Sequence, residues 1–374
     1  MSDERPTTIE AKRVNDLVMR FIRPLIDTPD LEQTIKLNRT DTIAYLKRML
    51  YANQPEYLIA LSVARPFNLF WISRALDALD ALDEETSTDI AKTILALQHP
   101  GGGFRGHVSC GAHTITTYSA LTTLVIVSPH TRVPVLDLID RPGLYSYLSS
   151  VHMPDGSYRM EPDGEIDMRA VYAAVISGKI AGIWSSELEA GVADYILSCQ
   201  TYEGGLAAAP GLEAHGSFTG LGLAALDLIK GDLGGLDVAR LQRWVVYRQT
   251  EEGGFNGRTN KVVDGCYSTW LGMACGVLAR HGHSTITDPV ALQRYLLAAC
   301  QCPGGGLLDK PDCSRDAYHT CYDLCGLSMA QMLPGARVYG DASNSVGPTD
   351  PRFNVKPGVV AAIEAWTRAN IIRS

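Results

Sequence analysis

The sequence has little of what marks a nucleic-acid-binding or membrane-spanning protein. None of its apolar runs reaches the roughly 18 residues that a transmembrane helix needs. Positive charge is also scarce, because 33 Lys and Arg stand against 41 Asp and Glu, a formal net charge of −8. Non-specific binding to nucleic acid or to an anionic membrane needs a basic surface. We therefore expect neither a nucleic-acid partner nor stable membrane insertion.

A secretory framework is missing as well. The nine cysteines are odd in number, and the start of the chain, Met1 to Arg5, lacks the apolar core of a signal peptide. The end, Ile371 to Ser374, carries no prenylation box. We expect reduced thiols and a cytoplasmic protein. With 46% hydrophobic and 20% charged residues, the chain is long enough for a large core in one or two domains.

What the sequence does contain is an internal repeat. Five Gly-rich turns end in an apolar residue at positions 104, 158, 206, 255 and 307, which are 54, 48, 49 and 52 residues apart. Each turn is followed by a helical segment rich in small residues and then by a more amphipathic helix. Each repeat is thus predicted to be a helical hairpin. Gln98, Gln200, Gln249 and Gln301, before four of the turns, are expected to close a helix.

Stacked hairpins bury the small-residue helices inside the amphipathic ones, either in an open solenoid or in a closed ring. A repeat of this length over most of the chain favours an all-α structure, an α/α barrel of about six hairpins. We expect residues 1–45 to form a helical extension and residues 46–374 to form the barrel. Residues 336–350, rich in Gly, Ser, Asn and Pro, are expected to be a surface loop.

Three candidate metal ligands come from two similar segments of the chain. Asp264 and Cys266 flank a glycine, and His319 follows some fifty residues later. A catalytic zinc site keeps three protein ligands and leaves the fourth tetrahedral position for water or substrate, whereas a structural site closes it. The trio therefore indicates a catalytic zinc. The alternative is that Asp264 caps a helix while Cys266 and His319 are ordinary core residues.

Two cations precede these ligands. Arg258 and Lys261 are three residues apart in a chain that is acidic overall, and the planar guanidinium suits phosphate oxygens. Such a pair is also common on an ordinary solvated face. Because it stands beside the candidate zinc ligands, the pattern favours an anionic substrate with a leaving group, for which diphosphate is the obvious candidate.

These motifs belong to long strings that resemble the β subunits of protein prenyltransferases, most of all those of protein farnesyltransferases. The densest strings run from Gly211 to Gly216, from Gly257 to Ser268 and from Gly305 to Tyr322. The likeness extends from about Leu46 to Val355. It implies an α/α barrel, or toroid, with a central funnel-shaped cavity for the isoprenoid, in agreement with the repeat.

By this resemblance, Asp264, Cys266 and His319 bind Zn²⁺, whose open position takes the cysteine of a C-terminal Cys-a-a-X box in an acceptor protein. A bound cation deprotonates a coordinating thiol, and the thiolate attacks carbon 1 of farnesyl diphosphate. Four residues match diphosphate-binding positions, namely His215, Arg258, Lys261 and Tyr267. Lys261 and Tyr267 also match catalytic positions.

A magnesium site is also implied. Asp309 matches a carboxylate that is associated with Mg²⁺ in farnesyltransferases and is absent from geranylgeranyl enzymes. A loop Asp can equally cap a turn.

The resemblance further assigns the walls of the cavity. Residues that match aromatic wall positions are Trp71, Tyr118, Tyr172, Phe218, Trp270 and Tyr318, and those near the C-terminal carboxylate of the peptide are His113, Glu165 and Arg169. Aromatic residues at helical spacing otherwise indicate a core. Phe67 differs from the family pattern. At this position farnesyltransferases generally have a Trp at the floor of the cavity, and geranylgeranyl enzymes have a small hydroxyl residue. Tyr322 follows the farnesyl pattern, so we expect a farnesyl donor with looser length selection.

Members of this family work with an α subunit that supplies a catalytic lysine, so a heterodimer is implied. A type I geranylgeranyltransferase β subunit is the nearest alternative. A terpene cyclase on the same barrel would need a carboxylate array, and no Asp-x-Asp-Asp string occurs. A glycan-cleaving barrel would need two catalytic carboxylates and no zinc, and a scaffold would need none of the three ligands.

Overall fold

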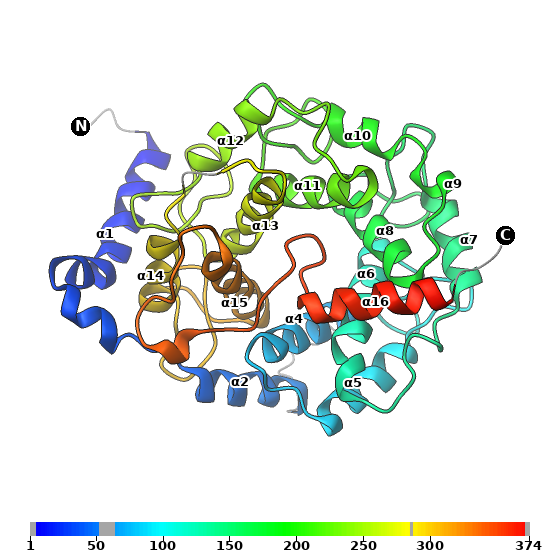
Figure 1. The fold of residues 1–374 in the computed structure, drawn as a ribbon, viewed down its shortest axis with the longest axis horizontal. Helices are drawn as coiled ribbons and strands as arrows, with labels where there is room; N and C mark the ends of the chain where they lie inside the picture. Colours follow the sequence, from blue (N-terminus) through cyan, green and yellow to red (C-terminus); the bar gives the residue numbers. More distant parts are fainter. Residues whose placement is uncertain (1–4, 52–63, 285–286, 371–374) are drawn as a thin grey trace.

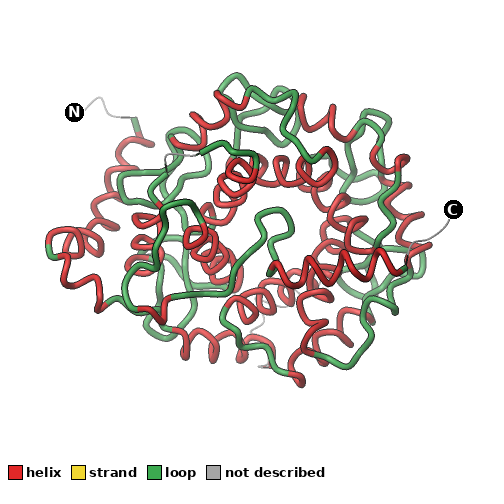
Figure 2. Tube along the Cα trace, viewed as in Figure 1, coloured by secondary structure: helices red, strands yellow, loops and turns green. Residues whose placement is uncertain are grey.

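The computed structural model describes residues 5–51, 64–284 and 287–370. Within these ranges the chain consists of helices and loops, and its β pairing is limited to isolated bridges (Figure 2). None of the described helices combines the length and apolar composition that crossing a membrane requires.

Six helices form an inner ring around a common centre (Figure 1). Each packs against the next, and the last packs against the first, so the ring is closed. Every residue of the second of them is buried except Ile115, as expected for a helix rich in small and apolar residues. The inner helices are α4 (Arg65–Ala78), α6 (Thr114–Val127), α8 (Met168–Ala181), α11 (Gly216–Lys230), α13 (Tyr267–Arg280) and α15 (Ala317–Met332).

Each inner helix is preceded by an amphipathic outer helix. In the fifth hairpin the outer helix buries Leu241, Trp244 and Val245 on one face, at three- and four-residue spacing. The outer helices are α2 (Arg39–Tyr51), α5 (Glu84–Leu95), α7 (Arg141–Val151), α10 (Val192–Ser198), α12 (Val238–Val246) and α14 (Pro289–Ala299). The predicted α/α barrel of six hairpins is therefore confirmed.

The remaining helices lie outside this plan. Helix α1 (Pro6–Asp27) packs against α14 through a buried stripe at Val14, Val18 and Ile22. The boundary expected after residue 45 falls within α2, and the division into two domains stays a prediction. Short elements fill the connections, namely η1 (Pro29–Thr34), η3 (Ser128–His130), α9 (Ser186–Glu189) and η4 (Ala342–Asn344).

The Gly-rich turns do more than end helices. Gly102 has φ +92°, and a Cβ there would lie 1.9 Å from the carbonyl oxygen of Gly143, so no other residue fits. The glutamine before each of four turns accepts a hydrogen bond from a backbone N–H at the start of the next outer helix. These donors are Asp140, Asp237, Asp288 and Asn38, at 2.6, 2.8, 2.7 and 2.8 Å. The last of them joins the final repeat to the first.

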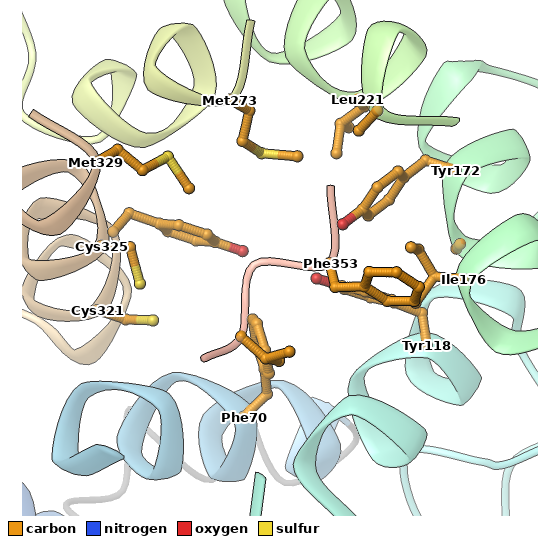
Figure 3. Close-up of a cluster of buried hydrophobic side chains, with 14 of the residues drawn as sticks. Phe70, Tyr118, Tyr172, Ile176, Leu221, Met273, Cys321, Cys325, Met329 and Phe353 are labelled. Atoms are coloured by element: carbon orange, nitrogen blue, oxygen red, sulfur yellow. The ribbon is translucent and has the colours of Figure 1, made fainter. Parts of the chain in front are cut away.

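The segment after α15 closes one end of the barrel. It runs into the centre of the ring, where Phe353 lies among side chains of the inner helices (Figure 3). The fully buried Arg74 donates from Nε to the carbonyl of Asn354 at 2.8 Å and pairs with Asp77 at 3.2 Å. Helix α16 (Pro357–Ala369) then packs on α8 and α6.

The prediction of a surface loop at residues 336–350 was right only in part, because Arg337 and Ser343 are exposed while Asn344 and Thr349 are buried. Asn344 is fully buried, accepts a hydrogen bond from the N–H of Leu37 at 2.7 Å, and donates to the carbonyls of Ile35 and Tyr339. A polar residue satisfied in this way lies inside the fold because its partners replace water.

Candidate active site

A cavity of 530 Å³ lies inside the barrel, at the end opposite the closing segment. Its walls come from the first two turns of the inner helices and from the loops before them, so its mouth lies at the rim of the Gly-rich turns. The structure places all eleven predicted pocket residues on this wall: Phe67, Trp71, His113, Tyr118, Glu165, Arg169, Tyr172, Phe218, Trp270, Tyr318 and Tyr322. His215 and Tyr267 line it as well.

The aromatic rings of the wall touch one another in sequence. Trp71 is 5.7 Å from Phe67 and 5.5 Å from Tyr318, centroid to centroid. Tyr322 continues the series, 4.7 Å from Tyr318 and 4.4 Å from Trp270. Such edge-on and tilted pairs are favourable arrangements that leave large apolar faces toward the cavity. The lining therefore suits a long, unsaturated hydrocarbon chain.

Some lining residues did not figure in the sequence analysis, namely Ile115, Ser119, Met160, Ala173 and Ser217. For three of them the signal was the helical period. Ile115 stands three residues before Tyr118 and Ala173 four residues after Arg169, so each shares a helix face with a predicted wall residue, and Ser119 stands four residues after Ile115. Leu221 also lines the cavity.

Polar side chains reach the mouth because they cap the inner helices. The Nδ1 atoms of His113 and His215 accept backbone N–H groups at the starts of α6 and α11, both at 3.2 Å. Asp167 caps α8 and also holds Arg169, with Oδ2 3.0 Å from Nε, while Glu165 lies 3.2 Å from the same guanidinium. The caps satisfy orphan donors, and the helix N-termini add partial positive charge at the mouth.

The three candidate ligands converge beside the cavity, next in sequence to its lining residues Tyr267 and Tyr318, but none of the three lines it. One ligand atom each from Asp264, Cys266 and His319 lies within 4.8 Å of the others, the one group of this kind among the described residues. Nε2 of His319 is 3.6 Å from Oδ1 of Asp264, and its Nδ1 is 2.7 Å from Oδ2 of Asp316. A histidine that donates its other ring nitrogen to a carboxylate is typical of metal ligands.

The protonation states fit a site built for a cation. Burial raises the pKa of the Cys266 thiol to about 12, so the thiol stays protonated unless a positive charge is near. Burial opposes ionisation of Asp264, but its bonds with His319 and Cys266 keep its pKa below the ordinary value. For His319, the neighbouring carboxylates outweigh burial and raise the pKa well above its usual range.

The predicted diphosphate residues fall into two groups. His215 and Tyr267 meet at the cavity wall, with Nε2 and the phenol oxygen 3.2 Å apart. Arg258 and Lys261 lie on the loop before Asp264 and do not line the cavity. Arg258 instead pairs with Glu213 at 3.3 Å, with both side chains about half exposed. The carboxylate of Asp309, the predicted magnesium ligand, pairs with Lys310.

His215 should make stability depend on pH. Burial, assisted by Arg258, lowers its pKa from 6.5 to about 4. The unfolded chain therefore binds the proton more tightly, so this contribution to stability is complete above pH 6.5 and is lost as the pH falls toward 4. We expect the unfolding midpoint to drop across this window and His215→Gln to flatten the drop, measured by chemical denaturation. Equal slopes in both proteins would contradict this.

Residues 37–355 match the family described as the prenyltransferase alpha-alpha toroid domain. The protein farnesyltransferase β subunit of Pisum sativum is 36% identical, covering 82% of this chain and 89% of the relative. That of Schizosaccharomyces pombe is 37% identical, covering 76% of each. The chain belongs to the protein prenyltransferase β-subunit family.

As such a β subunit, the chain is an enzyme component that serves prenyl transfer. The geranylgeranyl transferase type-1 β subunit of Arabidopsis thaliana is 33% identical over 59% of this β subunit and 60% of the relative. A solved structure, Candida albicans protein geranylgeranyltransferase-I complexed with GGPP, has a TM-score of 0.75 and 18% identity, covering 90% of this chain and all of that one. At that identity the likeness shows the fold.

Proposed function

We propose that this β subunit transfers a farnesyl group from farnesyl diphosphate to the cysteine of a C-terminal Cys-a-a-X box. The observation that carries the proposal is the convergence of Asp264, Cys266 and His319 within 4.8 Å, next to residues that line an aromatic cavity. A thiol acceptor needs activation at the mouth, and an isoprenoid needs an apolar wall below it. The two features occur together here.

The donor set of one carboxylate, one thiol and one imidazole fits Zn²⁺. When bound, such a cation supplies the positive charge that ionises a coordinating thiol at neutral pH. Asp316 positions His319 through the 2.7 Å contact with Nδ1. For Mg²⁺, Asp309 is the proposed ligand, and it would have to leave Lys310 to take that role.

The β subunit's own residues would receive the leaving diphosphate. His215 is uncharged at neutral pH, because its pKa is about 4, so Nε2 and the Tyr267 hydroxyl form a neutral hydrogen-bonding pair at the wall. The N-termini of α11 and α13 favour an anion at the same rim. Arg258 and Lys261 lie outside the cavity lining, and their positive charges would stabilise the negative charge that develops on the leaving diphosphate.

Peptide binding is proposed at the other side of the mouth. Arg169 is held by Asp167 and Glu165, and His113 lines the same wall. The Arg169 guanidinium already donates hydrogen bonds to acidic neighbours, so it can bind a C-terminal carboxylate only with its remaining N–H groups. This favours a contact that is bridged by ordered water. We further propose a heterodimer with an α subunit, which completes the peptide site, and a cytoplasmic location.

A single assay tests the donor and the acceptor together. The β subunit, co-expressed with a prenyltransferase α subunit, is given a peptide ending in a Cys-a-a-X box and either farnesyl or geranylgeranyl diphosphate. We expect thioether product with farnesyl diphosphate, and none from a peptide with Ser in place of Cys. Preference for geranylgeranyl diphosphate would identify a type I geranylgeranyltransferase, an alternative that Phe67 keeps open because it is smaller than Trp.

Arg258→Ala and Lys261→Ala should each lower kcat/KM for the diphosphate donor by roughly ten- to a hundredfold. A charge-assisted hydrogen bond is worth about 1.5–3 kcal/mol, and a factor of ten corresponds to about 1.4 kcal/mol. Glu213→Gln is the matched control, because it breaks the ion pair of Arg258 without removing the cation. It should leave binding unchanged or tighter. An unchanged kcat/KM in both alanine variants would show that Arg258 and Lys261 are ordinary solvated surface residues.

A further inference from the structure

Asp323 is a buried carboxylate for which the proposed reaction has no use. It lies on α15 four residues after His319, so the two side chains share a helix face. Its relative exposure is 0%. Neither of its carboxylate oxygens has a hydrogen-bond partner among the described residues.

The carboxylate of Asp323 lies against the turn that carries two of the proposed ligands. A Cβ added at Gly265 would be 2.5 Å from Oδ1 and 2.6 Å from Oδ2 of Asp323. Gly265 stands between Asp264 and Cys266, its N–H donates to the carbonyl of Asp309 at 2.8 Å, and its carbonyl accepts from Ser268 Oγ at 2.5 Å. The Asp323 side chain is thus in direct contact with the backbone that sets the ligand positions.

The surroundings give this carboxylate little compensation. Burial raises the pKa of Asp323 well above its ordinary value, and the charges of Asp264, Asp316 and Asp309 act in the same direction, whereas His319 acts against them. A buried carboxylate without a partner is therefore costly to ionise unless a positive charge is near. A divalent cation held by Asp264, Cys266 and His319 would bring positive charge to the place where it is missing.

We infer that Asp323 is a positioning residue for the metal, which strengthens cation binding by its charge and holds the Asp264–Cys266 turn from behind. The inference rests on the proposed zinc site and deepens it. Partners beyond the direct ligands commonly contribute 10- to 100-fold to metal affinity. A loss of about that size is expected when the charge of Asp323 is removed without a change of shape.

The test measures Zn²⁺ affinity in the full chain, purified with its α partner and stripped of metal, by competition with a chromophoric chelator at one fixed pH. Asp323→Asn should weaken Zn²⁺ binding by about 10- to 100-fold. Asp323→Ser serves as a second neutral variant in case the first fails to fold. Asp227→Asn is the control, since Asp227 is a buried carboxylate at the far end of α11, where it pairs with Arg280 and His281. The zinc affinity of this variant should equal that of the wild type.

Melting temperatures separate positioning from a merely structural role. We expect the melting temperature of the metal-free Asp323 variants not to fall, while the rise caused by Zn²⁺ becomes smaller than in the wild type. Zinc affinity equal to the wild type in a folded Asp323 variant would overturn the inference and leave the proposed function intact. A wild-type protein that binds no Zn²⁺ would overturn both.

Discussion

His319→Ala and Cys266→Ala should each abolish stoichiometric Zn²⁺ binding and lower prenyl transfer by at least about a thousandfold. A metal contributes several kcal/mol to such a reaction, and about 1.4 kcal/mol corresponds to a factor of ten. The acceptor thiol, with an ordinary pKa of about 8.5, would be mostly protonated at neutral pH once the cation is lost. Metal analysis of the purified protein and turnover of a Cys-a-a-X peptide measure the two effects.

The barrel should survive both changes, because its stability comes from the packing of the six hairpins and from the glutamine contacts between repeats. Circular dichroism on heating provides this control. Asp264→Asn should lose zinc less completely, since the amide oxygen of Asn can still approach the metal although it lacks the negative charge of the carboxylate. If His319→Ala and Cys266→Ala retained one Zn²⁺ per chain, the assignment of the ligands would be wrong.

The inner and outer helices were predictable because their signals are local. Small residues on every face mark a helix buried on every side, and a fixed spacing between Gly-rich turns marks equal hairpins. The segment that closes the barrel was not predictable in this way. The carbonyls of Asn354 and Arg352 accept hydrogen bonds from Arg74 and Tyr172, which are far away in the sequence. A Gly- and Asn-rich composition alone suggests a solvated loop.

The site could be predicted where the sequence resembles the motifs of a known family. It could be predicted less well where the contacts depend on how separate elements pack together. The proximity of Asp264, Cys266 and His319 follows from their places at the starts of neighbouring helices α13 and α15. The pairing of Arg258 with Glu213 depends on two loops, from different repeats, that meet at the rim. The contact of Asp323 with Gly265 depends on helix rotation within the ring, which no local pattern encodes.

Phe67→Thr should shift the donor preference toward geranylgeranyl diphosphate, by on the order of a hundredfold in the ratio of kcat/KM values. Phe67 lies in the first turn of α4 and lines the cavity, with its ring centroid 5.7 Å from that of Trp71. Its replacement by Thr removes a ring from the wall and leaves space that a longer ligand can fill. Both diphosphates compete in one reaction, and the two products are separated and counted.

The expected shift has a physical ceiling and a matched control. A further isoprene unit adds five carbons, and at about 0.8 kcal/mol for each buried methylene the gain would reach about 4 kcal/mol if all of them were buried. Phe218→Thr makes the same chemical change near the mouth, where the ring of Phe218 lies 5.0 Å from that of His215. It should slow transfer of both donors and leave their ratio unchanged.

Tyr322→Phe should add to the effect of Phe67→Thr. The Tyr322 ring lies between Trp270 and Tyr318 in the series of aromatic contacts, and its side chain is 6% exposed. Loss of the hydroxyl removes one polar atom from the wall that the added isoprene unit has to pass. If the double variant kept the wild-type preference, then neither Phe67 nor Tyr322 would limit the length of the isoprenoid, and the limit would have to lie deeper, where Tyr172 meets the carbonyl of Arg352 in the closing segment at 2.9 Å.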